Sequence, residues 1–340
     1  MKILITGGAG YIGSHTIIEL SKIPGFEIIS ADNFINSTPE TFSRIKKITG
    51  REIKNYPVDL TDFNAAKLIF SENPDLAGII HFAALKAVGE SVKNPVLYFR
   101  NNLNSLVNLL GLSSEKKINY FIFSSSCTVY GNIRNLPVSE TTPLLKTESP
   151  YGFTKLAGER LIEDFCLSNP LFNAIVLRYF NPVGAHISGT IGELPINAPN
   201  NLVPIITQTA AGIQKKMFVH GTDYPTRDGT CIRDYVHVSD IAKAHVLALQ
   251  HLIENNGNAN FEIFNLGKGL GVSVLEVIAA FEKISGMKLN YEIGPRRAGD
   301  VDAIYSDSSK AEKILGWKPL AGLEEMMGSA WKWQKVLSGI

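Results

Sequence analysis

The sequence has no large excess of either charge and no long apolar run. Its 340 residues carry a formal net charge of +1 without a basic stripe, which argues against binding to nucleic acid or to an anionic membrane surface. No apolar stretch approaches the ~20 residues of a membrane-spanning helix, and the first strand runs directly into glycines rather than into a leader pattern. We therefore expect a cytoplasmic protein.

Cysteine is also scarce, with three residues at widely separated positions, Cys127, Cys166 and Cys231. An odd number at such spacing is typical of reduced thiols rather than of a disulfide framework. The sequence contains neither a Cys-x-x-Cys nor a His-Glu-x-x-His pattern, and its seven histidines are scattered. We therefore predict no metal site.

The N-terminal segment has the order strand, glycine turn, helix. Lys2–Thr6 is predicted to be a buried strand, and it leads into Gly7, Gly10 and Gly13 directly before a helical pattern over Ser14–Ser21. Glycines at such places permit a tight turn, close approach of the backbone to a pyrophosphate, and packing of helix on strand. Their spacing is one residue longer than the common dinucleotide fingerprint. The segment predicts a dinucleotide-binding loop.

An acidic residue follows the second predicted strand. This strand, Phe26–Ala31, ends in Asp32, about 20 residues beyond the glycines, where an acid hydrogen-bonds the ribose 2'-hydroxyl of a bound dinucleotide. A carboxylate there repels a 2'-phosphate, so the sequence favours NAD over NADP. The alternative is a solvated aspartate at the end of a strand.

Further strands alternate with helices up to residue 180. They are predicted to end at Val58 and to cover Leu76–Phe82, Tyr120–Phe123 and Ile175–Phe180, and a Gly/Pro/Asn-rich stretch follows. The fold class is therefore α/β, a Rossmann-type doubly wound parallel sheet with a smaller C-terminal α/β lobe that binds substrate. We expect domains at residues 1–180 and 181–340, with residues 236–266 returning to the first.

Polar and small residues follow several of these strands. Asp59 could reach an adenine amine, whereas Asp62 suits the cap of the next helix. The small side chains of Ala83 and Ala84 would let the backbone approach a cofactor. Lys86 is either a phosphate contact or an ordinary surface lysine. In the next helix, two amides, Asn101 and Asn102, stand among leucines, which indicates that at least one has a specific partner.

The segment after Ser149 carries the most chemistry. Ser149 and Pro150 predict a helix start, because the hydroxyl can cap the first turn and proline leaves no N–H unpaired there. Tyr151 and Lys155 then share one helical face, with Cβ atoms roughly 5–6 Å apart. At an effective dielectric of ~20, the ammonium supplies about 3 of the roughly 4 kcal/mol needed to lower a tyrosine pKa from about 10 to about 7.

A second positive charge, such as an oxidised nicotinamide ring, would supply the rest of the roughly 4 kcal/mol that a Tyr151 pKa of about 7 requires. The strand Tyr120–Phe123 leads into Ser124, Ser125 and Ser126 and so delivers Ser126 to the edge of the sheet where ligands bind. Taken alone, the pair of Tyr151 and Lys155 also fits an ordinary helix, and a serine triplet also fits an ordinary turn. Together they predict an acid-base site beside a dinucleotide.

The motifs at residues 6–13, 124–126, 151–155 and 178–185 resemble those of the UDP-glucose 4-epimerase family, which belongs to the extended short-chain dehydrogenases/reductases. The likeness continues through residues 82–91, 228–238 and 296–300, so it covers essentially the whole chain. The resemblance implies an isomerase that interconverts UDP-galactose and UDP-glucose through a 4-keto intermediate, with transient hydride transfer to tightly bound NAD. It also implies a homodimer and a role in galactose metabolism, and leaves activity on UDP-GlcNAc and UDP-GalNAc open.

The resemblance also implies roles for individual residues. The catalytic residues would be Ser126, Tyr151 and Lys155. The residues that contact NAD would be Gly7, Gly10, Tyr11, Ile12, Gly13, Asp32, Asn33, Asp59, Leu60, Phe82, Ala83, Ala84, Lys86, Asn101, Ser124, Tyr151, Lys155 and Tyr179. The residues that contact the UDP-sugar would be Lys86, Ser126, Tyr151, Asn181, Asn201, Leu202, Phe218, His220, Arg233, Arg297, Asp300 and Ile304.

Two positions depart from the family pattern. The residue before Gly221, usually aromatic and beside the uracil, is His220. The residue beside the hexose, often tyrosine in members restricted to unacetylated sugars, is Ile304. A branched aliphatic side chain there predicts weaker but measurable activity on N-acetylated sugars.

Proteins of the same fold could have three other functions. A nucleotide-sugar 4,6-dehydratase needs an acid and a base where this chain has Cys127 and Thr128, so dehydration is disfavoured. A non-catalytic NAD sensor would not need the pair of Tyr151 and Lys155. A dehydrogenase that releases its cofactor differs from an epimerase in requiring a net redox partner.

Overall fold

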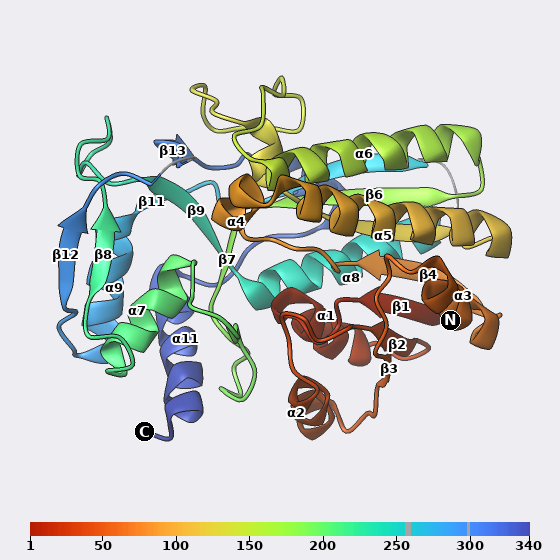
Figure 1. Cartoon of the computed structure of the whole chain (residues 1–340), viewed down its shortest axis with the longest axis horizontal. Coiled ribbons are helices and arrows are strands. Elements are labelled where there is room, and N and C mark those ends of the chain that lie inside the picture. The colour runs from red at the N-terminus through yellow and green to blue at the C-terminus, as the bar shows by residue number, and fades with distance from the viewer. Residues whose placement is uncertain (256–259, 298–299) are drawn as a thin grey trace.

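The structure is a computed structural model of the chain that describes residues 1–255, 260–297 and 300–340. Its larger lobe is built on a seven-stranded parallel sheet with the order β10-β6-β5-β4-β1-β2-β3 (Figure 1). The predicted Rossmann-type sheet is thereby confirmed. In chain order its strands are β1 Lys2–Thr6, β2 Glu27–Ala31, β3 Lys54–Tyr56, β4 Leu76–His81, β5 Tyr120–Ser126, β6 Asn173–Tyr179 and β10 Phe261–Leu266.

Helices cover both faces of this sheet (Figure 1). Alternate residues of each strand face opposite ways, so Ile3 and Ile5 of β1 pack under one layer while Leu4 packs under the other. Full burial of such a side chain contributes about 1.5–3 kcal/mol. The first layer is α1 Tyr11–Ser21, α2 Glu40–Thr49 and α8 Val238–Asn255, and the second is α3 Phe63–Glu72, α5 Pro95–Lys116 and α6 Pro150–Ser168. A short helix, α4 Val88–Lys93, packs on α5 and α6, and a 3-10 turn, η1 Cys127–Tyr130, packs on α6.

The smaller lobe has its own apolar core and two small sheets. Strand β9 pairs with β7, β11 and β13, and β8 pairs with β12. The core is formed by helices α7, α9 and α11 against these strands. The bounds are β7 Asn181–Val183, α7 Leu202–Ala210, β8 Met217–His220, β9 Ile232–His237, β11 Gly271–Ser273, α9 Val274–Ser285, β12 Tyr291–Gly294, β13 Ala303–Ile304 and α11 Leu323–Ser338.

Three late elements pack on the large sheet. Strand β10, predicted as Phe261–Leu266, pairs in parallel with β6, α8 packs on α1, and α10 Ser309–Leu315 packs on β10 and α8. The chain therefore crosses from the first sheet to the smaller lobe after β6 and returns through α8 and β10. Among the described residues, no helix is long and apolar enough to cross a membrane.

Some element boundaries differ from those predicted. Ser124–Ser126 belong to β5 rather than to a turn after it, because their backbone pairs with Leu177–Tyr179 of β6. The third strand ends at Tyr56 rather than Val58, since β3 is an edge strand that pairs only with three residues of β2. Helix α1 begins at Tyr11, three residues earlier than expected.

Two glycine substitutions should change stability in opposite directions. A Cβ at Gly13 would lie 2.2 Å from the carbonyl oxygen of Gly7, so Gly13→Ala should lower the free energy of unfolding by about 1–3 kcal/mol. A Cβ at Gly111, inside α5, would meet no neighbouring element within 4 Å, so Gly111→Ala should raise it by about 0.5–1 kcal/mol. Urea unfolding of both variants measures this, and shifts of the same sign would contradict the packing described.

Candidate active site

At its glycines, the loop between β1 and α1 leaves no room for a side chain. Gly7 has a left-handed backbone (φ 70°), and a Cβ there would lie 2.9 Å from the backbone nitrogen of Ala83. A Cβ at Gly10 would lie 3.0 Å from the carbonyl oxygen of Gly7. The turn brings the N-terminal end of α1 to the edge of the sheet, where its free N–H groups favour an anion. Of the next two residues, Ile12 packs against the apolar core and the Tyr11 hydroxyl donates to the carbonyl oxygen of Gly184 at 2.6 Å.

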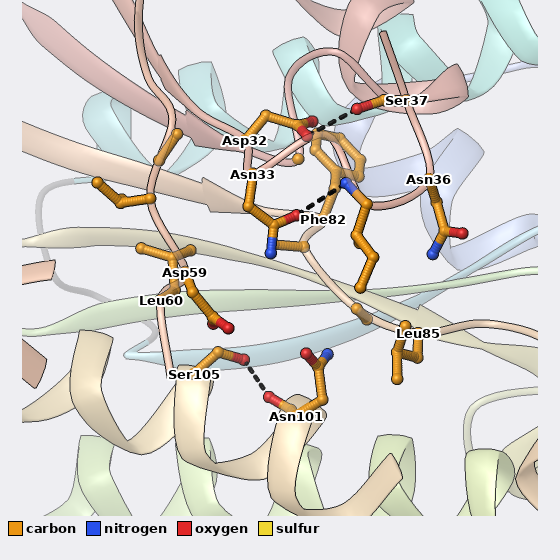
Figure 2. A pocket seen from close by; sticks show the side chains of 16 residues that line it. Asp32, Asn33, Asn36, Ser37, Asp59, Leu60, Phe82, Leu85, Asn101 and Ser105 are labelled. Carbon is orange, nitrogen blue, oxygen red and sulfur yellow. Dashed lines mark hydrogen bonds between the residues drawn. The ribbon is translucent and has the colours of Figure 1, made fainter. Parts of the chain in front are cut away.

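Asp32 connects this loop to the one that follows β2. Its Oδ2 accepts a hydrogen bond from the backbone nitrogen of Ala9 at 2.9 Å. Its Oδ1 accepts from the backbone nitrogen of Phe34 at 2.9 Å and from the Ser37 hydroxyl at 2.7 Å (Figure 2). Three donors thus fix the carboxylate at the carboxyl end of β2, where a ribose is expected.

A pocket of about 110 Å³ lies beside Asp32 at this edge of the sheet (Figure 2). The predicted cofactor residues that line it are Gly7, Asp32, Asn33, Asp59, Leu60, Phe82, Ala83, Ala84 and Asn101. Residues that the sequence reasoning missed also line it, namely Ala31, Ile35, Asn36, Ser37, Val58, Leu85 and Ser105. Two polar residues of this second set, Asn36 and Ser37, follow Asp32 closely in the chain, and that position was the signal that could have found them.

The two amides in α5 have different roles. Asn102 accepts from the backbone nitrogen of Leu85 and donates to its carbonyl oxygen, so it fixes the loop after β4. Asn101 donates to the Asn102 side chain at 3.0 Å and lines the pocket. Asp59 accepts from Thr61, and Asp62 caps α3 as the sequence suggested.

These features fit a dinucleotide. The loop has no space for a side chain at its glycines, it faces a helix N-terminus, and the pocket beside it holds a fixed carboxylate. Gly7, Gly10 and Gly13 would hold the pyrophosphate, and Asp32 would hold the adenosine ribose. Among the described residues, no group of three or more His, Cys, Asp or Glu side chains is arranged to hold a metal ion.

Helix α6 begins at Pro150, as predicted, and places Tyr151 and Lys155 under the carboxyl end of β5. The Ser149 hydroxyl accepts a hydrogen bond from the backbone nitrogen of Gly152 at 3.1 Å and so caps the helix. Both Tyr151 and Lys155 are buried. The Lys155 Nζ donates to the carbonyl oxygen of Ser124 at 2.7 Å and lies 6.0 Å from the centre of the Tyr151 ring.

The end of β5 gathers the remaining predicted groups. The Ser126 hydroxyl accepts from the backbone nitrogen and the hydroxyl of Thr128 at 3.2 and 3.0 Å. The Ser124 hydroxyl is hydrogen-bonded to the Tyr179 hydroxyl of β6. Tyr151 and Lys155 of α6 and Ser126 of β5, two separate segments of the sequence, are therefore brought to one place by the packing of α6 on β5.

The ionisation of this pair differs from our expectation. Burial raises the pKa of Tyr151 to about 12, and hydrogen bonding with Ser126 offsets this only in part. Burial also lowers the pKa of Lys155 to about 8, although the nearby Glu159 carboxylate acts in the opposite direction. For the protein alone, the expectation that Lys155 supplies most of the free energy that lowers the tyrosine pKa is wrong, because removal of the phenol from water is the largest influence on that pKa and raises it.

Arg233 and Arg297, predicted to bind a diphosphate, converge on one carboxylate. Arg233 Nη2 lies 3.5 Å from Asp300 Oδ1, and Arg297 Nε lies 3.2 Å from Asp300 Oδ2. Arg233 Nη1 also donates to the carbonyl oxygen of Val301 at 2.8 Å. Asp300 thus holds two guanidinium groups together, an arrangement that suits an anion with several oxygens.

Glu193, which the sequence reasoning missed, connects two predicted substrate contacts. Asn201 precedes α7 but its side chain does not cap that helix. Instead its Nδ2 donates to Glu193 Oε1 at 2.7 Å, and the same oxygen accepts from Lys86 Nζ at 3.0 Å. Lys86, after β4 of the first lobe, thereby meets Asn201 of the second lobe, while Leu202 begins α7 itself.

The remaining predicted substrate residues lie on strands of the smaller lobe. Asn181 begins β7, directly after the end of β6. Phe218 and His220 are two residues apart on β8, with ring centres 6.5 Å apart. Ile304, on β13, is buried in an apolar cluster with Cys127 and Phe180. Through Cys127 it is close in the fold to Ser126, which precedes that cysteine in the chain.

A family profile and several relatives match this chain over nearly its whole length. A profile described as "GDP-mannose 4,6 dehydratase" matches residues 4–329. The UDP-glucose 4-epimerase of Erwinia amylovora is 46% identical over 334 residues, which cover 98% of this chain and 98% of that protein.

Solved structures agree. The UDP-glucose 4-epimerase from Bifidobacterium longum, in complex with NAD+ and UDP, is 46% identical and superimposes with a TM-score of 0.94 over 100% of both chains. The enzyme from Stenotrophomonas maltophila, with bound NAD and formylated UDP-arabinopyranose, is 44% identical and has a TM-score of 0.95 over 100% of this chain and 99% of that one.

We predict that Asp32 sets the choice of cofactor. Asp32→Ser combined with Asn33→Arg removes the carboxylate and adds a cation on the exposed neighbouring residue, so binding of the 2'-phosphorylated dinucleotide should become measurable. Asn33→Arg alone keeps the carboxylate and should keep the preference for NAD. The ratio of dissociation constants for NADP and NAD checks this, and wild-type protein purified with NADP bound would contradict it.

Proposed function

The chain belongs to the UDP-glucose 4-epimerase family of the extended short-chain dehydrogenases/reductases, and from this premise we propose how its residues carry out the reaction. It is an NAD-dependent epimerase that interconverts UDP-galactose and UDP-glucose through a 4-keto sugar. Bound NAD supplies the hydride acceptor and donor at the sugar C4', so the cofactor returns to its starting state in each turnover.

Tyr151 acts as the acid-base group. As phenolate it takes the proton of the sugar 4'-hydroxyl, and as phenol it returns a proton to the 4-keto oxygen. Ser126 bridges the sugar hydroxyl and Tyr151, and Lys155, fixed by the Ser124 carbonyl oxygen, holds the cofactor ribose and supplies positive charge. The observation that carries this proposal is the convergence of Tyr151, Lys155 and Ser126 at the sheet edge that also carries the glycine loop.

The rest of the substrate is held by the smaller lobe. Arg233 and Arg297 contact the diphosphate, and Asp300 keeps the two guanidinium groups together. His220 and Phe218 offer ring faces to the uracil. The remaining contacts come from Lys86, Asn181, Asn201, Leu202 and Ile304.

Elimination of water from the sugar is disfavoured by the same geometry. Cys127 and Thr128 occupy the places where a 4,6-dehydratase carries its acid and base. Burial raises the pKa of the Cys127 thiol to about 12, so it stays protonated and neutral, and the Thr128 hydroxyl donates to Ser126. Neither side chain is an acid-base group at neutral pH.

Two broader features belong to the proposal. The first is the division into an NAD-binding domain at 1–180 and a UDP-sugar-binding domain at 181–340, with residues 236–266 joining the first, which the pairing of β10 with β6 supports. The second is a cytoplasmic homodimer serving galactose metabolism. Association of two copies of the chain is supported by exposed apolar side chains on α5 and α6, among them Val96, Val107 and Phe153.

One experiment separates an epimerase from a dehydrogenase that releases its cofactor. Purified protein, without added NAD, is mixed with UDP-galactose, and UDP-glucose is measured over time. An epimerase reaches equilibrium without any redox partner. If UDP-galactose is consumed only when NAD is added in an amount equal to the sugar, and NADH accumulates in place of UDP-glucose, the proposal is contradicted.

Tyr151→Phe should retain NAD but lose most activity. The ring still fills its buried place, whereas the acid-base hydroxyl is gone, and loss of such a group costs about 10²–10⁴-fold in rate. Tyr120→Phe, the same change at the opposite end of β5 from Ser126, is the matched control and should have normal activity. Turnover numbers and bound NAD are measured for both, and near-normal turnover of Tyr151→Phe would refute the mechanism.

Ile304 should set the tolerance for a 2'-N-acetyl group. Its branched side chain is stiff and buried, and overpacking beside it by a few atoms costs about 1–3 kcal/mol, or roughly a 5- to 150-fold preference for UDP-glucose over UDP-GlcNAc. Ile304→Tyr should abolish activity on the N-acetylated pair selectively, and Ile304→Ser should raise it. The measured quantity is the ratio of kcat/KM for the two sugars, and a constant ratio across all three proteins would show that Ile304 does not limit the pocket.

A further inference from the structure

A buried ion pair that the mechanism does not use joins α6, the helix that carries Tyr151 and Lys155, to β6. Glu159 is on α6, four residues after Lys155, and Arg178 is on β6. Arg178 Nη2 lies 2.6 Å from Glu159 Oε2, and Arg178 Nε donates to Glu159 Oε1 at 2.9 Å. The two side chains are 3% and 4% exposed. Burying two charges is an inefficient way to stabilise a core, since their removal from water offsets most of their attraction.

The Glu159 carboxylate also holds the strand that presents Ser126. The Ser125 hydroxyl donates to Glu159 Oε1 at 2.5 Å, and Lys155 donates to the carbonyl oxygen of the residue before it, Ser124. Because side chains alternate along a strand, Ser125 faces Glu159 while Ser124 and Ser126 face the site. Helix α6 is therefore hydrogen-bonded to β5 at Ser124 and Ser125, the two residues that precede the catalytic Ser126.

The far side of the ion pair is fixed as well. Arg178 Nη1 donates to the Tyr130 hydroxyl at 3.1 Å, and that hydroxyl donates to Asn265 Oδ1 at 2.7 Å. The Arg178 guanidinium also lies 5.0 Å from the centre of the Tyr130 ring. The position of the Glu159 carboxylate is thus determined by β6, η1 and β10 together, and a fixed carboxylate can fix what it touches.

Glu159 also bears on the charge of Lys155. Among the described residues, the titratable groups that interact with Lys155 are Tyr151 and Glu159 on its own helix and His81 on β4. Two further groups come from β6: Arg178 pairs with Glu159, and Tyr179 is hydrogen-bonded to Ser124. His81 is buried and neutral, since its pKa is lowered to about 3. Burial lowers the pKa of Lys155, whereas the Glu159 carboxylate raises it. Glu159 therefore favours the ammonium form that the reaction uses.

We propose that Glu159 is a positioning residue for the reaction: through Ser125 it fixes the end of β5 that carries Ser126, and from one turn further along α6 it places a negative charge beside the Lys155 ammonium. This inference rests on the proposed roles of Ser126 and Lys155. The proposal has two parts, the hydrogen bond of Glu159 to Ser125 and the negative charge of Glu159 near Lys155, and different variants remove them. Glu159→Gln removes the charge, whereas Ser125→Ala removes the hydrogen bond between β5 and Glu159 and leaves the ion pair of Glu159 with Arg178 in place.

Kinetics of the holoenzyme variants test the proposal. Glu159→Gln should lower kcat by about 10–100-fold, less than loss of the acid-base group itself, with a KM for UDP-galactose within about threefold of wild type. Without the carboxylate, Lys155 loses its proton at lower pH, so the alkaline fall of kcat should move to lower pH. Ser125→Ala should lower kcat and leave the pH profile unchanged. Glu163→Gln, one turn further along α6 in an exposed ion pair with Arg160, is the matched control and should behave as wild type.

A second readout needs no sugar. The protein is loaded with NAD, which should bring the pKa of Tyr151 into the range where Lys155 is still charged. In NAD-loaded Glu159→Gln the phenolate of Tyr151, followed by ultraviolet absorbance against the same protein carrying Tyr151→Phe, should form at higher pH, because Lys155 then loses its proton at lower pH. An inactive wild type would refute the proposed function alone, and this titration would still decide the role of Glu159. A folded Glu159→Gln with wild-type kcat, pH profile and titration overturns the inference. If Glu159→Gln does not fold, Ser125→Ala decides, and wild-type kcat in that variant overturns it.

Discussion

The reaction depends on a conflict between burial and charge at Tyr151. The same removal from water that excludes solvent from the sugar raises the pKa of the phenol to about 12 and lowers that of Lys155 to about 8. A tyrosine in that state is a poor base at neutral pH. Activity therefore requires further positive charge beside the ring, and an oxidised nicotinamide is a group that carries it. Proton and hydride transfer are coupled through this charge.

The rest of the fold holds that charge arrangement in place. The parallel sheet brings the ends of β1, β2 and β5 to one edge, so the glycine loop, Asp32 and Ser126 lie on the same side. Helix α6 carries Tyr151 and Lys155 and is tied to β5 through Ser124 and Ser125. The smaller lobe adds the cluster of Arg233, Arg297 and Asp300, which suits the diphosphate. Substrate is thus proposed to be anchored by one lobe and to react on the other.

Local patterns in the sequence were sufficient to predict much of this. The cap at Ser149, the i,i+4 pair on α6 and the glycine turn each depend on residues close in the chain, and the structure has them in place. Apart from Asn36 and Ser37, which follow Asp32 closely in the chain, what the sequence reasoning missed depends on tertiary contacts. The sign of the Tyr151 pKa shift follows from burial by several elements, and the pair of Glu159 and Arg178 joins a helix to a strand 19 residues away. The limits of β3 and β5 were set by pairing with neighbouring strands rather than by propensity.

The most direct test of this account is the pKa of Tyr151 in the presence of each redox form of the cofactor. Ultraviolet difference titration of wild type against Tyr151→Phe would follow the phenolate in protein that holds NAD and in protein that holds NADH. The account predicts a pKa far below 12 and near neutrality with NAD, and a clearly higher pKa with NADH, whose ring is uncharged. Equal pKa values in the two forms would contradict it.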